Sequence, residues 1–375
     1  MAYIVSFLVS VLMAYYVPKN LRKGEMKTGW RYIRFGWKSI NRRILILASC
    51  IGPILVSAFR YGIGTDYFYT YIPQFNLIAR GGESYYEIGF YLFNKFVALF
   101  TSDGQWLIAL CSIITIGVCY GQLFKQSKTY ILSITLFYLS YNYFISLNNI
   151  RQSLASAILL VAIECLINGE KIKFVAWVLI ASTIHRVSIV FILLIVFDKM
   201  FFSAITYFIM SCVMFGIAKI IAPRLIAFLA RHIPRLSLYM QASELAIYTK
   251  KTIGISYITL QFLIFLILIY LENNQTEVSH KDNMEWNLTK MIQCLLMCVV
   301  SMDGIVPAAY RIVRIFAFSQ FILIPNAIYK HEKNKNRKRI IWFIILGLYT
   351  FWFVYNYIQG TEQVFPYKSI FNKQS

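Results

Sequence analysis

The chain has 375 residues, of which 59% are hydrophobic and only 14% are charged, and its formal net charge at pH 7 is +21. Water-soluble domains of this length are far less apolar, so the composition excludes a soluble enzyme and indicates an all-α, polytopic integral membrane protein. The positive charge is concentrated in short segments between apolar runs. This placement indicates contact with anionic membrane lipids and argues against nucleic acid as a partner.

The apolar runs are each long enough, or nearly so, to cross about 30 Å of hydrocarbon as a helix. The first run lacks a basic start and a small-residue cleavage site, so we expect a membrane span there and not a removable signal peptide. In chain order the runs cover residues 2–16, 44–59, 105–124, 129–147, 150–167, 172–184, 201–222, 253–271, 288–303, 305–329 and 340–358.

Two basic segments set the expected topology. Residues 17–43 carry nine Lys and Arg residues and residues 330–339 carry six, each against a single Glu. Because positive loops mark the cytoplasmic side, an even number of crossings separates the two segments. The clear runs between them are odd in number, and a short run at 187–197, entered by a turn at His185, supplies the missing crossing. We therefore expect about twelve transmembrane or short hairpin helices and an external N-terminus.

Two further segments are predicted to lie in the membrane interface. Residues 85–100 are the alternative source of the missing crossing, but their polar side chains share one helical face, which is typical of an interfacial helix. Residues 223–250 mix basic and apolar side chains. We expect them to form a second interfacial helix or a lid, with lipid headgroup binding as the purely structural alternative.

We expect a single membrane domain over residues 1–375, without a soluble domain. Its parts are a first span with a basic cytoplasmic loop (1–43), a core (44–330), and a second basic cytoplasmic loop with the last span (331–375). The seven cysteines lie in or beside apolar runs, where cysteine usually packs as a small hydrophobic residue. They lack the neighbouring ligands of a metal site, so neither a disulfide framework nor a metal is expected.

On this topology several polar clusters meet the external face. The first is "RYGIGTDY" at residues 60–67, where the glycines let the backbone turn out of the second span. Arg60 and Asp66 either pair with each other or order the external loop and a bound sugar. Tyr67 either stacks on a sugar or anchors the chain at the membrane interface, as tyrosines often do.

The segment "SLNNIRQSLASAILL" begins a helix on which Asn148, Arg151 and Gln152 share one face. An Arg at the edge of a span becomes costly toward the membrane centre and usually faces protein or a wet cavity. Arg151 therefore either binds a phosphate in a cavity or extends to the lipid headgroups. Asn149 and Gln152 stand beside it as candidate sugar contacts.

Two later clusters add a base and further cations. His185 lies inside an apolar run, next to Arg186; a His can accept a proton from a hydroxyl nucleophile, and its alternative role is a hydrogen bond between helices. Arg311 and Arg314 lie one helical turn apart, where like charges repel unless a pyrophosphate or an Asp from another span lies between them. No phosphate-binding loop, zinc motif or nucleophile elbow occurs, so no cofactor is expected.

Taken together, these motifs resemble the EpsG-type branch of the Wzy-like bacterial polysaccharide polymerases. The resemblance covers about residues 44–330 and depends on the order and spacing of its motifs, each of which is weak alone. They are "RYGIGTDY", "EIGFYLFNKF", "NNIRQSLASAI", "ASTIHRVSIV" and "RIVRIFAFSQFILIP".

The resemblance implies a GT-C-like polymerase of capsule or exopolysaccharide biosynthesis. Such an enzyme joins oligosaccharide repeat units carried on undecaprenyl pyrophosphate, without a metal, at the external face of the bacterial cytoplasmic (inner) membrane. Flippase and chain-length regulator proteins are the further partners it implies. By role, the implied site residues are His185 and Asp66 for the acceptor proton, Arg151, Arg186, Arg311 and Arg314 for the pyrophosphate, and Arg60, Tyr67, Asn149 and Gln152 for the sugar or the loop.

Two other functions use similar residues. A transporter or flippase of lipid-linked saccharide also needs arginines in a cavity, but we expect it to show polar groups down to the membrane midplane and paired broken helices. A membrane O-acyltransferase also uses His and Arg within spans, yet nothing in the sequence indicates an acyl donor. A noncatalytic assembly partner is the remaining alternative.

Overall fold

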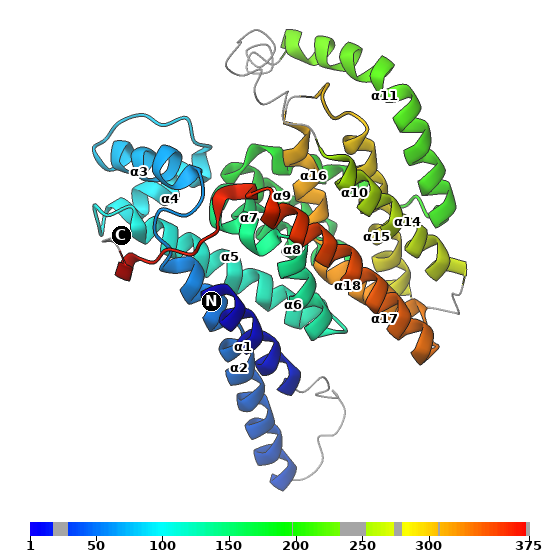
Figure 1. The fold of residues 1–375 in the computed structure, drawn as a ribbon, viewed down its shortest axis with the longest axis horizontal. Helices are drawn as coiled ribbons and strands as arrows, with labels where there is room; N and C mark the ends of the chain where they lie inside the picture. Colours follow the sequence, from blue (N-terminus) through cyan, green and yellow to red (C-terminus); the bar gives the residue numbers. More distant parts are fainter. Residues whose placement is uncertain (18–28, 197, 233–252, 274–279, 307, 373–375) are drawn as a thin grey trace. The chain divides into compact units, whose positions relative to one another are not determined.

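The computed structural model describes residues 1–375 except 18–28, 197, 233–252, 274–279, 307 and 373–375 (Figure 1). The regular secondary structure of the described residues is helical, and their only β contact is an isolated antiparallel bridge between Arg60 and Ser369. The predicted all-α fold is confirmed. Two compact units divide the chain: unit 1 comprises Met1–Ala157 and Phe353–Ser375, and unit 2 comprises Ile158–Trp352.

In unit 1 the first two helices run side by side (Figure 1). Small residues allow this close approach: Ser49 donates to the carbonyl oxygen of Ser10 at 2.9 Å, and a Cβ on Gly52 would lie 3.5 Å from the backbone of Ser6. The helices of this unit are α1 (Ala2–Tyr16), α2 (Gly29–Ala58), the π-helix η1 (Tyr67–Tyr71), α3 (Ile72–Ala79), α4 (Ile88–Ala98), α5 (Gln105–Gln126), α6 (Tyr130–Leu139), α7 (Asn142–Asn148), the start of α8 (Ile150–Ile167), the end of α18 (Lys335–Ile358), and the short turns η3 (Thr361–Gln363) and η4 (Ile370–Asn372).

In unit 2 a buried amide network joins four helices. Gln320 donates to the side-chain oxygens of Gln261 and Gln293 at 2.8 Å each, and Tyr349 donates to Gln320 at 3.1 Å. These bonds stabilise helix packing where apolar surroundings give little hydrophobic driving force. The other elements of unit 2 are α9 (Lys171–Ile184), the 3-10 helix η2 (Arg186–Ile192), α10 (Leu193–Val196), α11 (Ala204–His232), α14 (Ile255–Asn273), α15 (His280–Val300), α16 (Ala309–Ala317) and α17 (Gln320–His331).

Five of the described helices are long and apolar enough to cross a membrane, and up to seven spans result if each bent pair counts as one. The pairs α6 with α7 and α16 with α17 bend by 50° and 42°. A polytopic membrane protein is therefore confirmed, whereas about twelve crossings and a GT-C-like architecture are not. Several predicted runs form helices shorter than a span, such as α1 and η2 with α10. In α15, Lys290 lies within the predicted run 288–303 and Glu285 lies just before it.

The predicted turn at His185 is confirmed. α9 ends at Ile184, His185 is extended with φ −144° and ψ 107°, and η2 packs back against α9. The predicted interfacial segment 85–100 contains the 11-residue helix α4, which is too short to cross about 30 Å of hydrocarbon.

Helix boundaries differ from the prediction in two basic segments. α2 begins at Gly29, so it includes much of the stretch 17–43 that was predicted as a loop, because Lys and Arg are good helix formers. The start of the predicted interfacial helix at 223–250 instead continues α11 to His232, and residues 233–250 lie outside the described part of the chain.

Candidate functional site

The loop after α2 depends on two glycines. Gly62 and Gly64 have φ values of 60° and 85°, in the left-handed region that glycine adopts at low cost. A Cβ on Gly64 would lie 2.6 Å from the side-chain oxygen of Asn148 and 3.0 Å from its Cβ. The loop therefore packs directly against the end of α7. A residue with a side chain at position 64 would prevent this contact.

Asn148 connects this loop to the C-terminal segment. Its Oδ1 accepts the backbone N–H of Asp66 at 2.9 Å, while its Nδ2 donates to Oε2 of Glu362. Asn149 donates to the same oxygen at 2.7 Å. One carboxylate oxygen thus holds two neighbouring amides at the α7–α8 junction.

Arg151 forms an ion pair within an aromatic surrounding. Its Nη1 lies 2.7 Å from Oε2 of Glu87, and the exposed fractions of the two side chains are 18% and 14%. The guanidinium also lies over the ring of Tyr86 at 4.5 Å, with Tyr85 and Phe90 at 5.9 Å. A charge that is partly removed from water in this way acts more strongly on an anion than an exposed one.

Two phenols place Asp66 and Arg151 in the same electrostatic environment. Burial raises the pKa of Tyr71 and of Tyr86; for both phenols the Asp66 carboxylate adds to this shift and the Arg151 guanidinium opposes it. We call Asp66, Tyr71, Tyr86, Glu87 and Arg151 the Arg151 cluster. Within it, the Arg151 guanidinium is the group that can bind a phosphate, and a carboxylate is a group that can accept a proton.

Arg60 and Tyr67 support the loop from inside. Arg60 is fully buried, donates to the carbonyl oxygen of Ser57 and to Oγ of Ser112 at 2.7 Å, and does not pair with Asp66. Burial lowers the pKa of this guanidinium.

Gln105 completes this support. It donates to the carbonyl oxygens of Ala58 at 2.8 Å and Arg60 at 3.1 Å, and its own oxygen accepts from the Tyr67 hydroxyl at 2.5 Å. Arg60 and Tyr67 therefore order the loop from positions turned toward α2 and α5. The neighbouring candidate Gln152 is also buried, with 5% of its surface exposed.

The remaining predicted residues lie in unit 2, on two elements that contact each other. α16 packs against η2, and the rings of Phe316 and Phe191 stack with centroids 5.3 Å apart. His185 is 6% exposed and immediately precedes η2, whereas Arg186, its first residue, is exposed.

Arg311 and Arg314 share one aromatic partner on α16. Their guanidinium carbons lie 5.7 and 5.3 Å from the ring centroid of Tyr310, and Nε of Arg311 donates to its hydroxyl at 3.2 Å. The ring faces both cations, which reduces the mutual repulsion expected from their spacing. Unit 2 thus holds His185, Arg186 and this arginine pair on neighbouring elements.

Glu87 and Glu362 are two site residues that were not predicted from the sequence. Glu87 is the one acidic residue of "EIGFYLFNKF" and directly precedes an apolar helix, a position where a carboxylate needs a partner. That signal is sufficient to identify it. Glu362 follows the last apolar run without any pattern, and only the folded chain brings it to Asn148.

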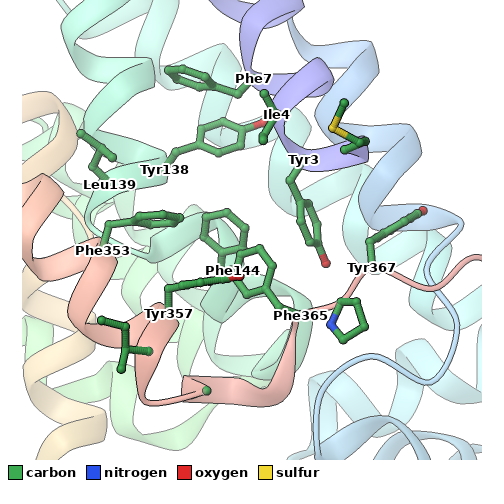
Figure 2. A pocket seen from close by; sticks show the side chains of 14 residues that line it. Tyr3, Ile4, Phe7, Tyr138, Leu139, Phe144, Phe353, Tyr357, Phe365 and Tyr367 are labelled. Atoms are coloured by element: carbon green, nitrogen blue, oxygen red, sulfur yellow. The ribbon is translucent and has the colours of Figure 1, made fainter.

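An apolar pocket of about 900 Å³ opens in unit 1. Figure 2 shows the aromatic rings that line it, contributed by α1, α6, α7, the end of α18 and the C-terminal segment. Phe144 lines this pocket one turn before Asn148 on α7. The same short helix therefore borders the apolar pocket and supports the polar loop. Among the residues that the structure describes, no three His, Cys, Asp or Glu side chains lie close enough together to hold a metal ion.

Comparison with known proteins identifies one family. The model of the EpsG family matches residues 43–369, which contain the Arg151 cluster, the His185 turn, the arginine pair on α16 and Glu362. No curated protein and no solved structure matches the chain significantly.

Proposed function

The chain belongs to the EpsG family, and we propose that it is a membrane glycosyltransferase that joins lipid-linked oligosaccharide repeat units in capsule or exopolysaccharide biosynthesis. The observation that carries this proposal is the family match over residues 43–369, within which the Arg151 cluster supplies a cation and two carboxylates beside an ordered loop. The family itself indicates a polysaccharide polymerase. The undecaprenyl carrier and the external face of the bacterial cytoplasmic membrane are the finer parts of the proposal.

The proposed reaction moves a sugar chain from one pyrophosphate to a hydroxyl group. The acceptor hydroxyl oxygen forms a bond to the anomeric carbon of the growing chain, and the bond from that carbon to the pyrophosphate oxygen breaks. The bonding electrons remain on the lipid pyrophosphate, and the hydroxyl proton goes to a base. Negative charge therefore develops on the leaving group, where a fixed guanidinium in a low-dielectric site stabilises it most.

Arg151 is the best placed cation for that leaving group in unit 1. Glu87 and the Tyr86 ring hold its guanidinium in one orientation before substrate binds. A pyrophosphate carries more charge than one carboxylate and competes for the same guanidinium protons. In unit 2, the proposed phosphate contacts are Arg186, Arg311 and Arg314, of which the last two are oriented by Tyr310.

The base is proposed to be His185 or Asp66. His185 ends the broken helix of unit 2, and Asp66 ends the glycine loop of unit 1, where Asn148 holds its backbone. A positioned base of this kind contributes about 10²–10⁴ in rate. The aromatic pocket bordering α7 is the proposed place for part of the lipid chain, because an apolar lining beside a polar site suits a substrate with one apolar end.

The test is a reconstitution of the purified protein in nanodiscs with lipid-linked repeat units and a chelator. We expect a ladder of products that differ by one repeat unit. Unchanged substrate would contradict the proposal. Movement of the unchanged substrate between the leaflets of a vesicle would instead indicate a flippase. In cells, the proposal expects a deletion strain to accumulate single repeat units at the external face.

A further inference from the structure

The C-terminal segment after α18 pairs with the loop that follows α2. The backbone N–H of Tyr61 donates to the carbonyl oxygen of Lys368 at 3.0 Å, and that of Ile370 donates to Phe59 at 2.9 Å. The N–H of Gly64 donates to Gln363 at 3.2 Å. These contacts join segments far apart in the sequence, at the start and in the middle of the 60–67 loop.

Glu362 immediately precedes Gln363, the residue that accepts from Gly64, and its backbone is strained. Its φ is 66° and that of Gln363 is 50°, values that are uncommon for residues with side chains. Such outliers persist only where surrounding contacts hold them, and they cluster at functional sites. Here the holding contacts are the hydrogen bonds from Asn148 and Asn149 to Glu362.

The carboxylate is the charged one of two acceptors that orient the Asn148 amide, the other being Oγ1 of Thr65 at 3.2 Å. A side-chain amide has a donor end and an acceptor end, and a carboxylate can only accept. Glu362 therefore binds the NH₂ group of Asn148 and turns its oxygen toward the loop, where that oxygen accepts the N–H of Asp66 at 2.9 Å. Without Glu362 the NH₂ group keeps only the neutral Thr65 hydroxyl as an acceptor, so the amide is held less firmly and the bond that places Asp66 weakens.

We propose that Glu362 is a positioning residue for the glycosyl transfer site. It orients Asn148 and Asn149 and through them fixes the 60–67 loop, with Asp66, against the start of α8, which carries Arg151. This assignment depends on the proposed function. The orientation of Asn148 by Glu362, which is the structural part of the assignment, does not depend on the proposed function.

Four variants separate positioning from other roles. Glu362→Ala removes the carboxylate that both amides share, and we expect kcat to fall by about 10- to 100-fold with little change in KM, as for small misplacements of a reacting group. Glu362→Gln keeps an oxygen that can accept from both asparagines, so most of the activity is expected to remain. Asn148→Asp places a second carboxylate against Glu362 and is expected to be as impaired as Glu362→Ala. Glu83→Ala, which removes an exposed carboxylate of the same unit, is the matched control.

The decisive variant is the double substitution Asn148→Asp with Glu362→Gln. The NH₂ group of the amide introduced at position 362 can donate to the carboxylate introduced at position 148, while Asn149, which now donates to the same Oε2 position, has to turn to the remaining amide oxygen. The other oxygen of that carboxylate still accepts from the Asp66 N–H, so we expect activity to recover above that of Asn148→Asp alone. A double variant no better than the single one, or a Glu362→Ala protein with wild-type kcat, overturns the proposal. A Glu362→Gln protein as inactive as Glu362→Ala would instead assign Glu362 to proton transfer.

Hydrogen–deuterium exchange of residues 60–67 provides a readout independent of activity. Glu362→Ala and Asn148→Asp are expected to speed exchange there, and the double variant is expected to restore it. If the wild-type protein forms no polymer but these exchange changes occur, the proposed function fails while the orientation of Asn148 by Glu362 stands. If the wild-type protein polymerises and exchange is unchanged in Glu362→Ala, the positioning role fails alone.

Discussion

The guanidinium of Arg151 donates a 2.7 Å hydrogen bond to the carboxylate of Glu87, a residue 64 positions earlier in the chain. The pair joins the start of α8 to the residue that precedes α4, and the Tyr86 ring covers one face of the guanidinium. Neither charge is stable alone in such surroundings, because a partly buried ion without a partner loses hydration that nothing replaces. Each residue therefore supports the placement of the other.

We expect Glu87→Ala and Arg151→Ala each to lower the free energy of unfolding by about 2–3 kcal/mol, somewhat less than the loss of one partner in a fully buried pair. The double variant is expected to lose less than the sum. A double-mutant cycle in detergent measures this coupling. The exposed Lys173–Glu170 pair, whose side chains are 65% and 42% exposed, is the control and should show no measurable coupling. Additive effects at Glu87 and Arg151 would contradict the pairing.

Two glycines with nearly equal φ angles allow the cost of backbone strain to be measured separately from that of a steric collision. Gly64 (φ 85°) and Gly81 (φ 83°) both require the left-handed region, at about 1–2 kcal/mol for a residue with a Cβ. A Cβ at Gly81 meets nothing within 4 Å, whereas at Gly64 it collides with Asn148. We expect Gly64→Ala to lower the melting temperature more than Gly81→Ala and to abolish polymer formation. Equal effects on both measurements would show that the contact with Asn148 is unimportant.

His185→Ala is expected to abolish polymer in cells while expression and membrane insertion stay normal, because a general base contributes about 10²–10⁴ in rate. His232→Ala is the control, since that side chain is exposed near the end of α11. The measurement is the polymer yield of a deletion strain complemented with each variant. Retained polymer in His185→Ala would remove this residue from the mechanism and leave Asp66 as the base.

The buried position of Asp303 leads us to expect that the stability of the protein depends on pH. Burial raises the pKa of this carboxyl above its ordinary value of 3.8, and the N–H of Ile253, 2.5 Å away, partly opposes the shift. The pKa of Asp303 is higher in the folded protein than in the unfolded chain. The protonated carboxyl therefore contributes fully to the free energy of unfolding below pH 3.8, and this contribution is lost as the pH rises through the folded pKa.

Asp303→Asn keeps an oxygen for Ile253 but carries no charge at any pH. We expect its melting temperature to exceed that of the wild type at pH 7 and the difference to shrink toward acidic pH, as the wild-type carboxyl becomes protonated. Melting curves at several pH values measure this trend. A difference that stays constant, or grows on acidification, would contradict a raised pKa at Asp303.

The helices and the family could be predicted from the sequence because their signals are local. Apolar runs must form helices in a membrane to satisfy their backbone groups, and the break at His185 follows from the polar residues that interrupt one run. The expected number of about twelve crossings is not confirmed, for a related reason. Apolarity places a helix in the membrane, but length and packing decide whether a run crosses as one straight helix, as the bent pair α6 and α7 shows.

The site depends on contacts that no local pattern encodes. Arg60 and Asp66 lie within one motif, yet the Arg60 guanidinium turns inward, where its Nη1 donates to Ser57 of α2 and Ser112 of α5. Glu362 reaches Asn148 across 214 positions. A helical membrane protein of this family follows from the amino-acid sequence, since hydrophobicity and motif order are properties of the chain. Which carboxylate orients which amide or cation depends on the folded chain, because hydrogen bonds and ion pairs act over a few ångströms between atoms that folding brings together.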